Sequence, residues 1–432
     1  MNPLKMGMLL KFAALFLLTV SWTFAAGAFS YQSLPELPGS NIMDEDEQLL
    51  DTALVQIHDN DLDGALRNLK RVVERNPKFR LARLIYGDLL LARSGVIRPF
   101  GSRSSISDSG LDNLRKEARL RLQYRLSPPP RNTLPEPLLQ LSESQQYAIV
   151  VDVSESRLYF YEQRAGEPVL IGDYYATTGI GGALKKKEGD GKTPLGVYFI
   201  TSRLAPDNLP DLYGAGAFPI NYPNEWDSRL GRTGYGIWIH GVPSNTYNRA
   251  PKETYGCIAI PNNNVDRLWK LLGKNTAPVI LVRKINWISR AELQIRRSVV
   301  QGLLDTWRKD WTSTGPDHYA RHYSKDFSAS GKNYQAWMQE GPEQPFRNHL
   351  IPLRTSDVSF FSYPDEPNLV VVTFTQDYGP GSVGPSERKR QYWRFEADGQ
   401  WRIVYEGPAR FRKIHLQGIP PSARTGISRS FR

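Results

Sequence analysis

The sequence predicts a multidomain α+β protein, because the spacing of its apolar residues changes along the chain. Apolar residues recur at helical spacing over 45–95, alternate with polar residues from about 145 to 283, and return to helical spacing near 291. Long alternating stretches follow this last helix, in the order expected of helices packed on a curved antiparallel sheet. With 40% hydrophobic and 23% charged residues among 432, the chain can fill more than one core.

Residues 1–28 have the three parts of a secretory signal peptide. Lys5 and Lys11 supply positive charge, Phe12–Phe24 is an uncharged apolar run, and Ala26-Gly27-Ala28 offers the small residues that precede cleavage. We expect cleavage after this tripeptide. An uncleaved anchor is the alternative, although the run is shorter than the ~20 residues of a membrane span. We therefore expect a secreted protein, resident in a periplasm because the sequence shows no lipobox cysteine and no C-terminal anchor.

The net charge favours an anionic partner without identifying it. The formal charge is +11, and it falls to +9 when the two lysines of the signal are removed. Such a charge suits an envelope polymer or a membrane surface, but it also serves solubility alone, and both interpretations stay open. No pattern typical of base recognition is present, so we expect no nucleic-acid partner.

Residues 45–95 are predicted to form helices separated by turns at Asn60-Asp61 and Asn76-Pro77. The helical apolar positions are Leu50, Ala53, Leu54, Ile57, Ala65, Leu66, Leu69, Val72, Val73, Leu81, Ala82, Ile85 and Leu89. The pattern resembles about one and a half tetratricopeptide (TPR) units, fewer than the three usually needed for independent stability. We expect this TPR-like segment to pack on its neighbour or on a protein partner. Residues 96–143 contain Pro128-Pro129-Pro130 and are expected to be a stiff linker, with a basic amphipathic piece near 111–126.

Residues 145–283 are predicted to form a mostly antiparallel β domain. Its strands read YAIVVDV, RLYFYEQ, PVLIGDYYAT, GVYFIT, GIWIH and PVILVR, and one helix is expected at 264–272. From Arg290 a long helix precedes four further strands, DVSFFSY, NLVVVTFTQDY, RKRQYWRFEA and QWRIVYEG. This order resembles the cone-shaped nuclear-transport-factor-2-like (NTF2-like) fold over 291–409. The basic residues 410–432 are expected to be a disordered tail.

The stretch GIWIHGVPSNTYNRAPKETYGCIAIPNNN holds the most informative pair of residues. His240 lies at the end of one predicted strand, and Cys257, the one cysteine of the chain, lies at the start of the next. A secreted chain with a single cysteine cannot form an internal disulfide, so the thiol is reactive, intermolecularly linked, or buried and inert. If the two strands pair about 4.8 Å apart, the residues can come within hydrogen-bond reach. That arrangement is typical of a thiolate nucleophile with an imidazole base, whose charge lowers the thiol pKa from about 8.5.

Residues beside this pair fit the same chemistry. Gly256 leaves room beside the sulfur, and the backbone N–H groups of Tyr255, Gly256 and Cys257 could bind an oxyanion. The carbonyl of Gly241 could fix the imidazole tautomer. The alternative is a buried, inert cysteine beside a histidine that only ends its strand.

Three ordered blocks of residues 145–283 resemble the YkuD-type L,D-transpeptidase catalytic domain of bacterial wall enzymes. The family signature is a histidine, a spacer of some 15 residues, then Ser/Thr, any residue, Gly and Cys, which His240, Thr254, Gly256 and Cys257 match. The second block is TTGIGGALKKKEGDGKTPLGVYFIT and the third is FPINYPNEWDSRLGRTGYGIWIHG. The likeness is greater still to the subgroup that carries a C-terminal NTF2-like domain.

This resemblance implies an acyl transfer on peptidoglycan stem peptides, without a metal or an organic cofactor. It implies that Cys257 attacks the carbonyl of the third residue, that D-Ala leaves with a proton from His240, and that an amine or water resolves the thioester. Tyr222, Arg232 and Trp238, together with Thr254, are the candidates for the substrate groove. Transfer, hydrolysis by a carboxypeptidase and release of a wall-linked protein remain alternatives, as does a non-catalytic wall-binding scaffold.

The sequence departs from the family pattern at two positions, where Ala259 and Tyr255 stand in place of the basic residues that many members carry. Both changes bear on how donor and acceptor substrates are recognised.

Three other patterns could indicate a binding site, but we expect each to have a structural or surface role. Lys185-Lys186-Lys187 is expected to be a solvated turn. Gly191-Lys192-Thr193 lacks the first glycine of a phosphate loop. His318 and His322 have helical spacing but no third metal ligand nearby, so we expect no metal site.

Overall fold

The computed structural model describes residues 44–95, 101, 107–273, 276–311, 316–329, 331–340, 353–378 and 386–409. The expected signal peptide, 1–28, and the expected tail, 410–432, lie outside these residues. All described residues fall within one compact unit, 37–432. Within them, no helix combines the length and the apolar character that crossing a membrane would require.

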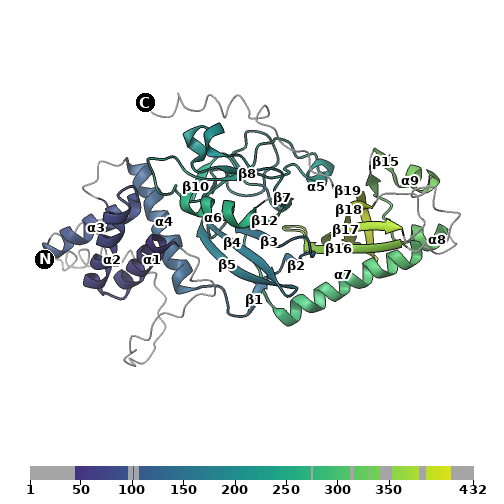
Figure 1. Ribbon diagram of the computed structural model, residues 1–432, viewed down its shortest axis with the longest axis horizontal. Helices are drawn as coiled ribbons and strands as arrows, with labels where there is room; N and C mark the ends of the chain where they lie inside the picture. The colour runs from purple at the N-terminus through teal and green to yellow at the C-terminus, as the bar shows by residue number, and fades with distance from the viewer. Residues whose placement is uncertain are drawn as a thin grey trace, which may run out of the picture. The chain divides into compact units, whose positions relative to one another are not determined.

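The N-terminal part is helical, as its periodicity predicts (Figure 1). It consists of α1 (Glu45–His58), α2 (Leu62–Arg75), α3 (Arg80–Arg93) and α4 (Asp108–Leu126). The carboxylate of Asp44 accepts a hydrogen bond from the N–H of Asp46 at 2.8 Å, and that of Asp61 accepts one from Gly64 at 2.9 Å, which caps α1 and α2. Leu50, Leu69 and other predicted positions form the core of this part.

The expected linker differs from the structure, because much of 107–143 is regular and packed. Helix α4 contacts α1 and α3. Strand β1 (Thr133–Pro135) pairs with β13 (Trp287–Ser289), and β2 (Leu138–Gln140) joins the C-terminal sheet. Buried Leu134, Leu138 and Leu139 explain the difference. These residues follow the triple proline. Their apolar stretch is too short for its periodicity to predict a strand.

The central part contains two sheets that enclose a core. The larger sheet has the order β5-β4-β3-β12-β7, and the smaller has the order β11-β9-β8. Their bounds are β3 Tyr147–Asp152, β4 Arg157–Arg164, β5 Glu167–Tyr175, β7 Gly196–Phe199, β8 Ala217–Pro219, β9 Trp238–His240, β11 Ile258–Ala259 and β12 Pro278–Val282. Short strands β6 (Thr178–Gly179) and β10 (Lys252–Thr254) pair in parallel. Helices α5 (Glu225–Arg229) and α6 (Asn262–Leu272) and the 3₁₀ turns Pro206–Asn208 and Asp211–Tyr213 complete this part.

The large central sheet is buried on both faces. On β3, Ile149 and Val151 face the core shared with the small sheet and α6, whereas Ala148 and Val150 face the core of the C-terminal part. Alternation along a strand explains the division, because successive side chains point to opposite faces. The central and C-terminal parts therefore share one hydrophobic core.

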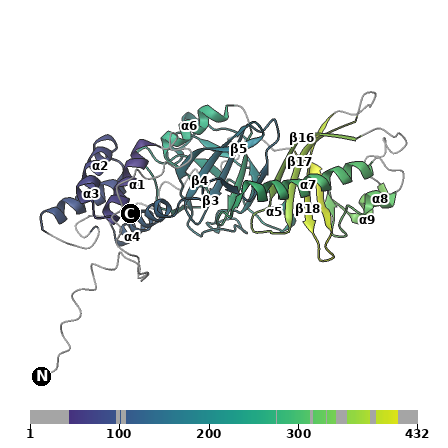
Figure 2. The same cartoon turned by 90° about the horizontal axis from the view of Figure 1, so that it is seen from below.

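The C-terminal part has a long helix and an antiparallel sheet, as the sequence predicts. Helix α7 (Arg290–Trp311) lies along the sheet of order β19-β18-β17-β16-β2 (Figure 2). Its strands are β16 Leu353–Ser362, β17 Leu369–Tyr378, β18 Glu387–Phe395 and β19 Trp401–Pro408. Short elements precede them: α8 Pro316–Ala320, β14 Ser328–Ala329, β15 Lys332–Asn333 and α9 Tyr334–Glu340.

Polar contacts reinforce the shared core at α5. The carboxylate of Glu225 accepts hydrogen bonds from Arg390 Nη1 at 2.7 Å and from the Tyr392 hydroxyl at 2.9 Å. The rings of Trp226 and Tyr392 stack with centroids 5.9 Å apart. Because Arg390 is buried, this carboxylate compensates its charge away from water.

Replacement of Glu225 by Ala should therefore lower the free energy of unfolding by about 3 kcal/mol, because it removes a carboxylate that compensates a buried cation. Glu155→Ala is the matched control, since Glu155 pairs at 3.2 Å with the exposed Lys284 and should cost less than about 1 kcal/mol. Denaturant unfolding of both variants measures the difference. Equal losses would contradict the assignment.

Candidate active site

The register of β9 and β11 places His240 and Cys257 on one face of the small sheet. The two strands pair in parallel, with Ile258 opposite Ile239 and Ala259 opposite His240. Ile239 and Ile258 point into the central core. By alternation, His240 and Cys257 project from the other face. They come from adjacent strands and are offset by two positions.

Tyr213 is a neighbour common to both residues, and the sequence alone did not indicate it. Its ring lies 4.9 Å from that of Trp238 and 5.1 Å from that of His240. Tyr213, Trp238 and Cys257 belong to one small apolar cluster beside the site. A tyrosine that follows the turn residues Pro210 and Asp211 carries no periodic signal, so only the folded structure reveals this contact.

The tautomer of His240 is fixed by the following residue. Its Nδ1 lies 2.6 Å from the carbonyl oxygen of Gly241. A carbonyl only accepts, so Nδ1 carries the proton and Nε2 keeps its lone pair. Burial lowers the pKa of His240 to about 4, and the charge of Arg249 acts in the same direction, against the opposing effect of the Gly241 carbonyl. The imidazole is therefore neutral at neutral pH.

Gly241 is itself tightly confined, which explains why a glycine follows the histidine. A Cβ there would lie 2.1 Å from Asn262 Oδ1. That oxygen accepts hydrogen bonds from the N–H groups of Ala215 and Val242, at 3.0 and 2.9 Å. Asn262 at the start of α6 therefore holds the backbone around His240.

The surroundings of Cys257 favour the protonated form of its thiol. This thiol donates to the carbonyl oxygen of Gly236 at 3.4 Å, and burial raises its pKa to about 11 despite smaller lowering effects from a Trp238 backbone hydrogen bond, Arg249 and Lys185. The expectation that an imidazolium lowers the thiol pKa is wrong for this state. Burial disfavours both charged forms, so thiol and imidazole rest as a neutral pair.

Thr254 and Gly256 shape the turn that presents the thiol. The Thr254 hydroxyl donates to the carbonyl of Cys257 at 2.7 Å and accepts from the N–H of Gly256 at 3.2 Å. Gly256 has φ +119°, and a Cβ there would lie 2.5 Å from the Lys192 carbonyl oxygen. The Gly256 N–H, an expected oxyanion donor, is thus occupied within the turn. Tyr255, the residue of another expected donor, is 86% exposed.

Of the three other groove candidates, the structure brings Trp238 to the thiol. Tyr222 is buried and its hydroxyl donates to the Thr233 carbonyl at 3.0 Å. Arg232 Nη1 donates to Asp227 Oδ1 at 2.9 Å. These contacts hold the segment before β9 in place, so Tyr222 and Arg232 have structural partners here rather than contacts to Cys257.

Two cations near the site were not expected from the sequence. The charges of Arg249 and Lys185 both act on the thiol. Lys185 is buried, with Nζ donating to Asp190 Oδ1 at 2.8 Å and to the Lys187 carbonyl at 2.9 Å, so the expectation of a fully solvated turn is wrong at this position. A lysine run gives no periodic signal that would separate its buried member from the exposed Lys186 and Lys187.

The described residues hold no group of three or more His, Cys, Asp or Glu side chains that could bind a metal ion. His318 is exposed, whereas His322 is buried with Nε2 2.7 Å from Asp310 Oδ2. The two histidines are four residues apart in the sequence, but one is exposed to solvent and the other is buried.

The turn geometry generates a prediction about Thr254. Thr254→Val keeps the side-chain shape but removes the bonds to the Cys257 carbonyl and the Gly256 N–H, so acylation of Cys257 should slow at least tenfold in a folded protein. Thr254→Ser keeps the hydroxyl and should restore most of the rate. Mass spectrometry of the acylated protein over time measures both variants. A valine variant that acylates at the wild-type rate would show that the turn does not need this hydroxyl.

Comparisons with known proteins match two parts of the chain to known domain families. The model of the L,D-transpeptidase catalytic domain (YkuD) matches residues 146–281, and the model of the Cds6 C-terminal NTF2-like domain matches residues 299–407. The YkuD family consists of cysteine-nucleophile L,D-transpeptidases and carboxypeptidases. A search of curated proteins finds no match.

Two solved structures share the fold over most of their length. Bd1075 of Bdellovibrio bacteriovorus is 29% identical with a TM-score of 0.55, over 65% of this chain and 100% of that chain. The helical cell shape determining protein Pgp2 of Campylobacter jejuni is 26% identical with a TM-score of 0.54, over 63% of this chain and 95% of that chain. Residues 146–281 of this chain therefore match the YkuD-type L,D-transpeptidase catalytic domain, and residues 299–407 match the Cds6-type NTF2-like domain.

Proposed function

We propose that the protein is a peptidoglycan-modifying cysteine acyl transferase, an L,D-transpeptidase that acts on stem tetrapeptides through a Cys257 thioester. One observation carries the proposal: a histidine with a fixed tautomer and a free Nε2 lone pair lies on the strand beside the single cysteine, on the same sheet face. The match of the surrounding domain to the YkuD family supports the substrate class.

The neutral resting pair defines the first chemical step. The thiol turns from the Gly236 carbonyl toward Nε2, and His240 takes its proton as sulfur bonds to the carbonyl carbon of the third residue. The bond to D-Ala then breaks, and its amine leaves with the proton from His240. An acceptor amine or water next attacks the thioester, and His240 takes a proton from it before returning the proton to the thiol.

The charge near the site suits an anionic substrate. Arg249 acts on both Cys257 and His240, and the terminal carboxylate of a tetrapeptide is drawn to such a cation. Trp238 has a buried Nε1 without a hydrogen-bond partner among the described residues, and that N–H would serve a substrate carbonyl. Among the groove candidates, Trp238 therefore has the support of the geometry.

Hydrolysis by a carboxypeptidase is the second candidate, because acylation is common to both reactions. Ala259 is buried and brings no cation beside the nucleophile. An acceptor stem peptide therefore lacks a basic side chain that could bind its carboxylate, whereas water does not need such a group. The presence of the His240–Cys257 pair opposes the third alternative, a wall-binding scaffold without catalysis.

The place of action is proposed from the sequence. We propose a periplasmic protein, in keeping with the signal-like residues 1–28. The likeness to a helical cell shape determining protein leads us to expect an altered cell shape when the gene is deleted.

The reaction itself is testable on purified disaccharide-tetrapeptide. We expect loss of D-Ala and dimers joined between two diamino-acid residues, or exchange of D-Ala for an added D-amino acid, by mass spectrometry. Cys257→Ala should abolish all products and leave the fold unchanged. Tripeptide alone, with abundant acceptor present, would establish hydrolysis in place of transfer, and no covalent adduct with a carbapenem would favour the scaffold.

The neutral pair predicts a characteristic pH dependence. Alkylation of Cys257 by iodoacetamide should keep rising by up to tenfold per pH unit to about pH 10, without a plateau near neutrality, since burial raises the thiol pKa to about 11. His240→Ala should leave this profile unchanged but abolish acylation. A plateau near pH 7 would show that an ion pair forms instead.

The same burial ties stability to pH. The pKa of His240 is about 4 in the folded chain and 6.5 ordinarily, so the unfolded chain binds the extra proton first. The stability contributed by the neutral imidazole is complete above pH 6.5 and is lost as the pH falls toward 4. Thermal unfolding of wild type and His240→Gln across this range measures the difference, and parallel curves would contradict it.

A further inference from the structure

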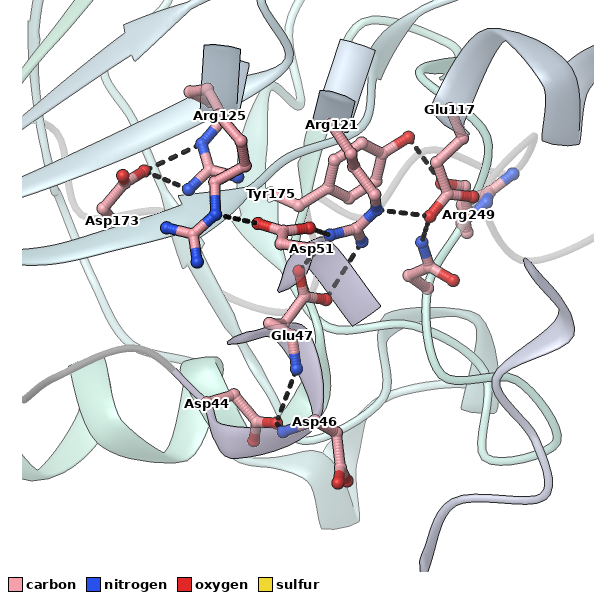
Figure 3. Close-up of polar contacts among 12 residues, drawn as sticks. Asp44, Asp46, Glu47, Asp51, Glu117, Arg121, Arg125, Asp173, Tyr175 and Arg249 are labelled. Carbon is pink, nitrogen blue, oxygen red and sulfur yellow. Dashed lines mark hydrogen bonds and ion pairs between the residues drawn. The ribbon is translucent and has the colours of Figure 1, made fainter. Parts of the chain in front are cut away.

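The buried Arg121 of α4 joins the helical part to the catalytic domain. Its guanidinium forms ion pairs with Glu47 and Asp51 of α1, and with Glu117 on its own helix, where Nε lies 2.8 Å from Oε1 (Figure 3). It also lies over the ring of Tyr175, at the end of β5, 4.3 Å from the centroid. Its side chain is 0% exposed, so these contacts are fully shielded from water.

The carboxylate of Glu117 that pairs with Arg121 also binds the active-site loop, residues 241–251. Oε1 accepts a hydrogen bond from Asn248 Nδ2 at 2.5 Å, in addition to the bond from Arg121. Asn248 lies in residues 241–251, which connect His240 to strand β10 and so lead to Cys257. Burial raises the pKa of Glu117 to about 7, while Arg121 and Asn248 oppose the rise. This carboxylate is thus the direct polar link between α4 and the segment joining base and nucleophile.

Other contacts from the helical part reach the same loop. The rings of Phe79 and Tyr247 stack with centroids 4.1 Å apart, and Lys78 Nζ donates to the Ser244 carbonyl at 2.7 Å. The helical part therefore packs on its neighbour, one of the two outcomes expected from its small number of repeats.

The loop is also held from the catalytic side, next to the nucleophile. The carbonyl of Arg249 accepts hydrogen bonds from the Tyr175 hydroxyl at 3.1 Å and from Thr177 Oγ1 at 3.0 Å. Thr177 pairs through its backbone with Ala259, two residues after Cys257. The residue after Asn248 is thus anchored beside the nucleophile strand, and its charge acts on both members of the pair.

We propose that Glu117 and Asn248 are positioning residues, through which the helical part holds the His240–Cys257 loop, and with it Arg249, in the geometry needed for acylation. The helices are then a component of the catalytic site rather than a separable module for a partner. Tyr175 contributes to both sides of this arrangement, since its ring contacts Arg121 and its hydroxyl binds the Arg249 carbonyl. The inference rests on the proposed acylation of Cys257.

The test compares variants of the full chain on both sides of the contact. Asn248→Ala and Glu117→Ala should each slow acylation of Cys257 by a carbapenem about tenfold, and the double variant should also lose about tenfold, because one shared bond is removed in all three. Glu117→Gln keeps an acceptor for Asn248 and should stay within about threefold of wild type. Asn68→Ala, which removes the bond to Gln56 Oε1 at 2.8 Å inside the helical part, should acylate at the full rate.

Two further measurements separate positioning from stability. Rates are taken well below each variant's unfolding temperature, and iodoacetamide alkylation of the same proteins should change less than threefold, because it requires an accessible thiol but not a fixed loop. If Glu117→Ala fails to fold, Asn248→Ala carries the test, with Glu117→Gln and Asn68→Ala as its controls. Wild-type acylation by folded Asn248→Ala, or losses that multiply in the double variant, would overturn the inference. Absence of acylation in wild type would instead refute the proposed function.

Discussion

The parallel pairing of β9 with β11 is the constraint on which the candidate site depends. Parallel neighbours need a long connection, because the chain must return to the same end of the sheet. Here that connection is the loop between His240 and Cys257. This pairing puts His240 and Cys257 on one face of the sheet. It also requires the long loop between them, which other parts of the molecule hold in place. Asn262, Thr177 and Tyr175 hold it from the catalytic domain, and Glu117 holds it from α4.

Burial sets the chemistry of the pair. Cysteine nucleophiles are often thiolates at rest, stabilised by a nearby cation or imidazolium. Here the pKa of the thiol is raised and that of the imidazole is lowered, so burial favours the neutral form of both groups. A neutral thiol also resists oxidation better than a thiolate.

Shared cores bind the parts of the chain into a rigid frame for the site. The large central sheet has no solvated face, since one side supports the small sheet and the other packs on the C-terminal strands. Between the helical part and the central part, a charged network around Arg121 accompanies the apolar contact of Phe79 with Tyr247. Buried ion pairs add little net stability, but they fix one geometry because alternatives leave charges unpaired. A network that fixes one geometry suits the positioning role proposed for Glu117 and Asn248.

The sequence by itself predicted many of the elements and singled out the pair His240 and Cys257. Period-two runs predicted β3, β4, β7 and β12, and helical spacing predicted α1 to α3 and α7. The motif ending in Gly256-Cys257 singled out His240 and Thr254, and the position of Gly241 after the histidine suggested its contact with the imidazole. Local pattern carries this information because it depends on residues near one another in the chain. Only the tertiary structure decided which distant segments meet. It showed that β1 and β2 of the expected linker join distant strands, that Tyr213 lies against His240, and that Glu117 reaches Asn248. It also showed that Lys185 is buried and that Thr254 shapes a turn. Each depends on a partner that local periodicity cannot identify, and the pKa values of Cys257 and His240 depend on burial that exists only once those partners have assembled.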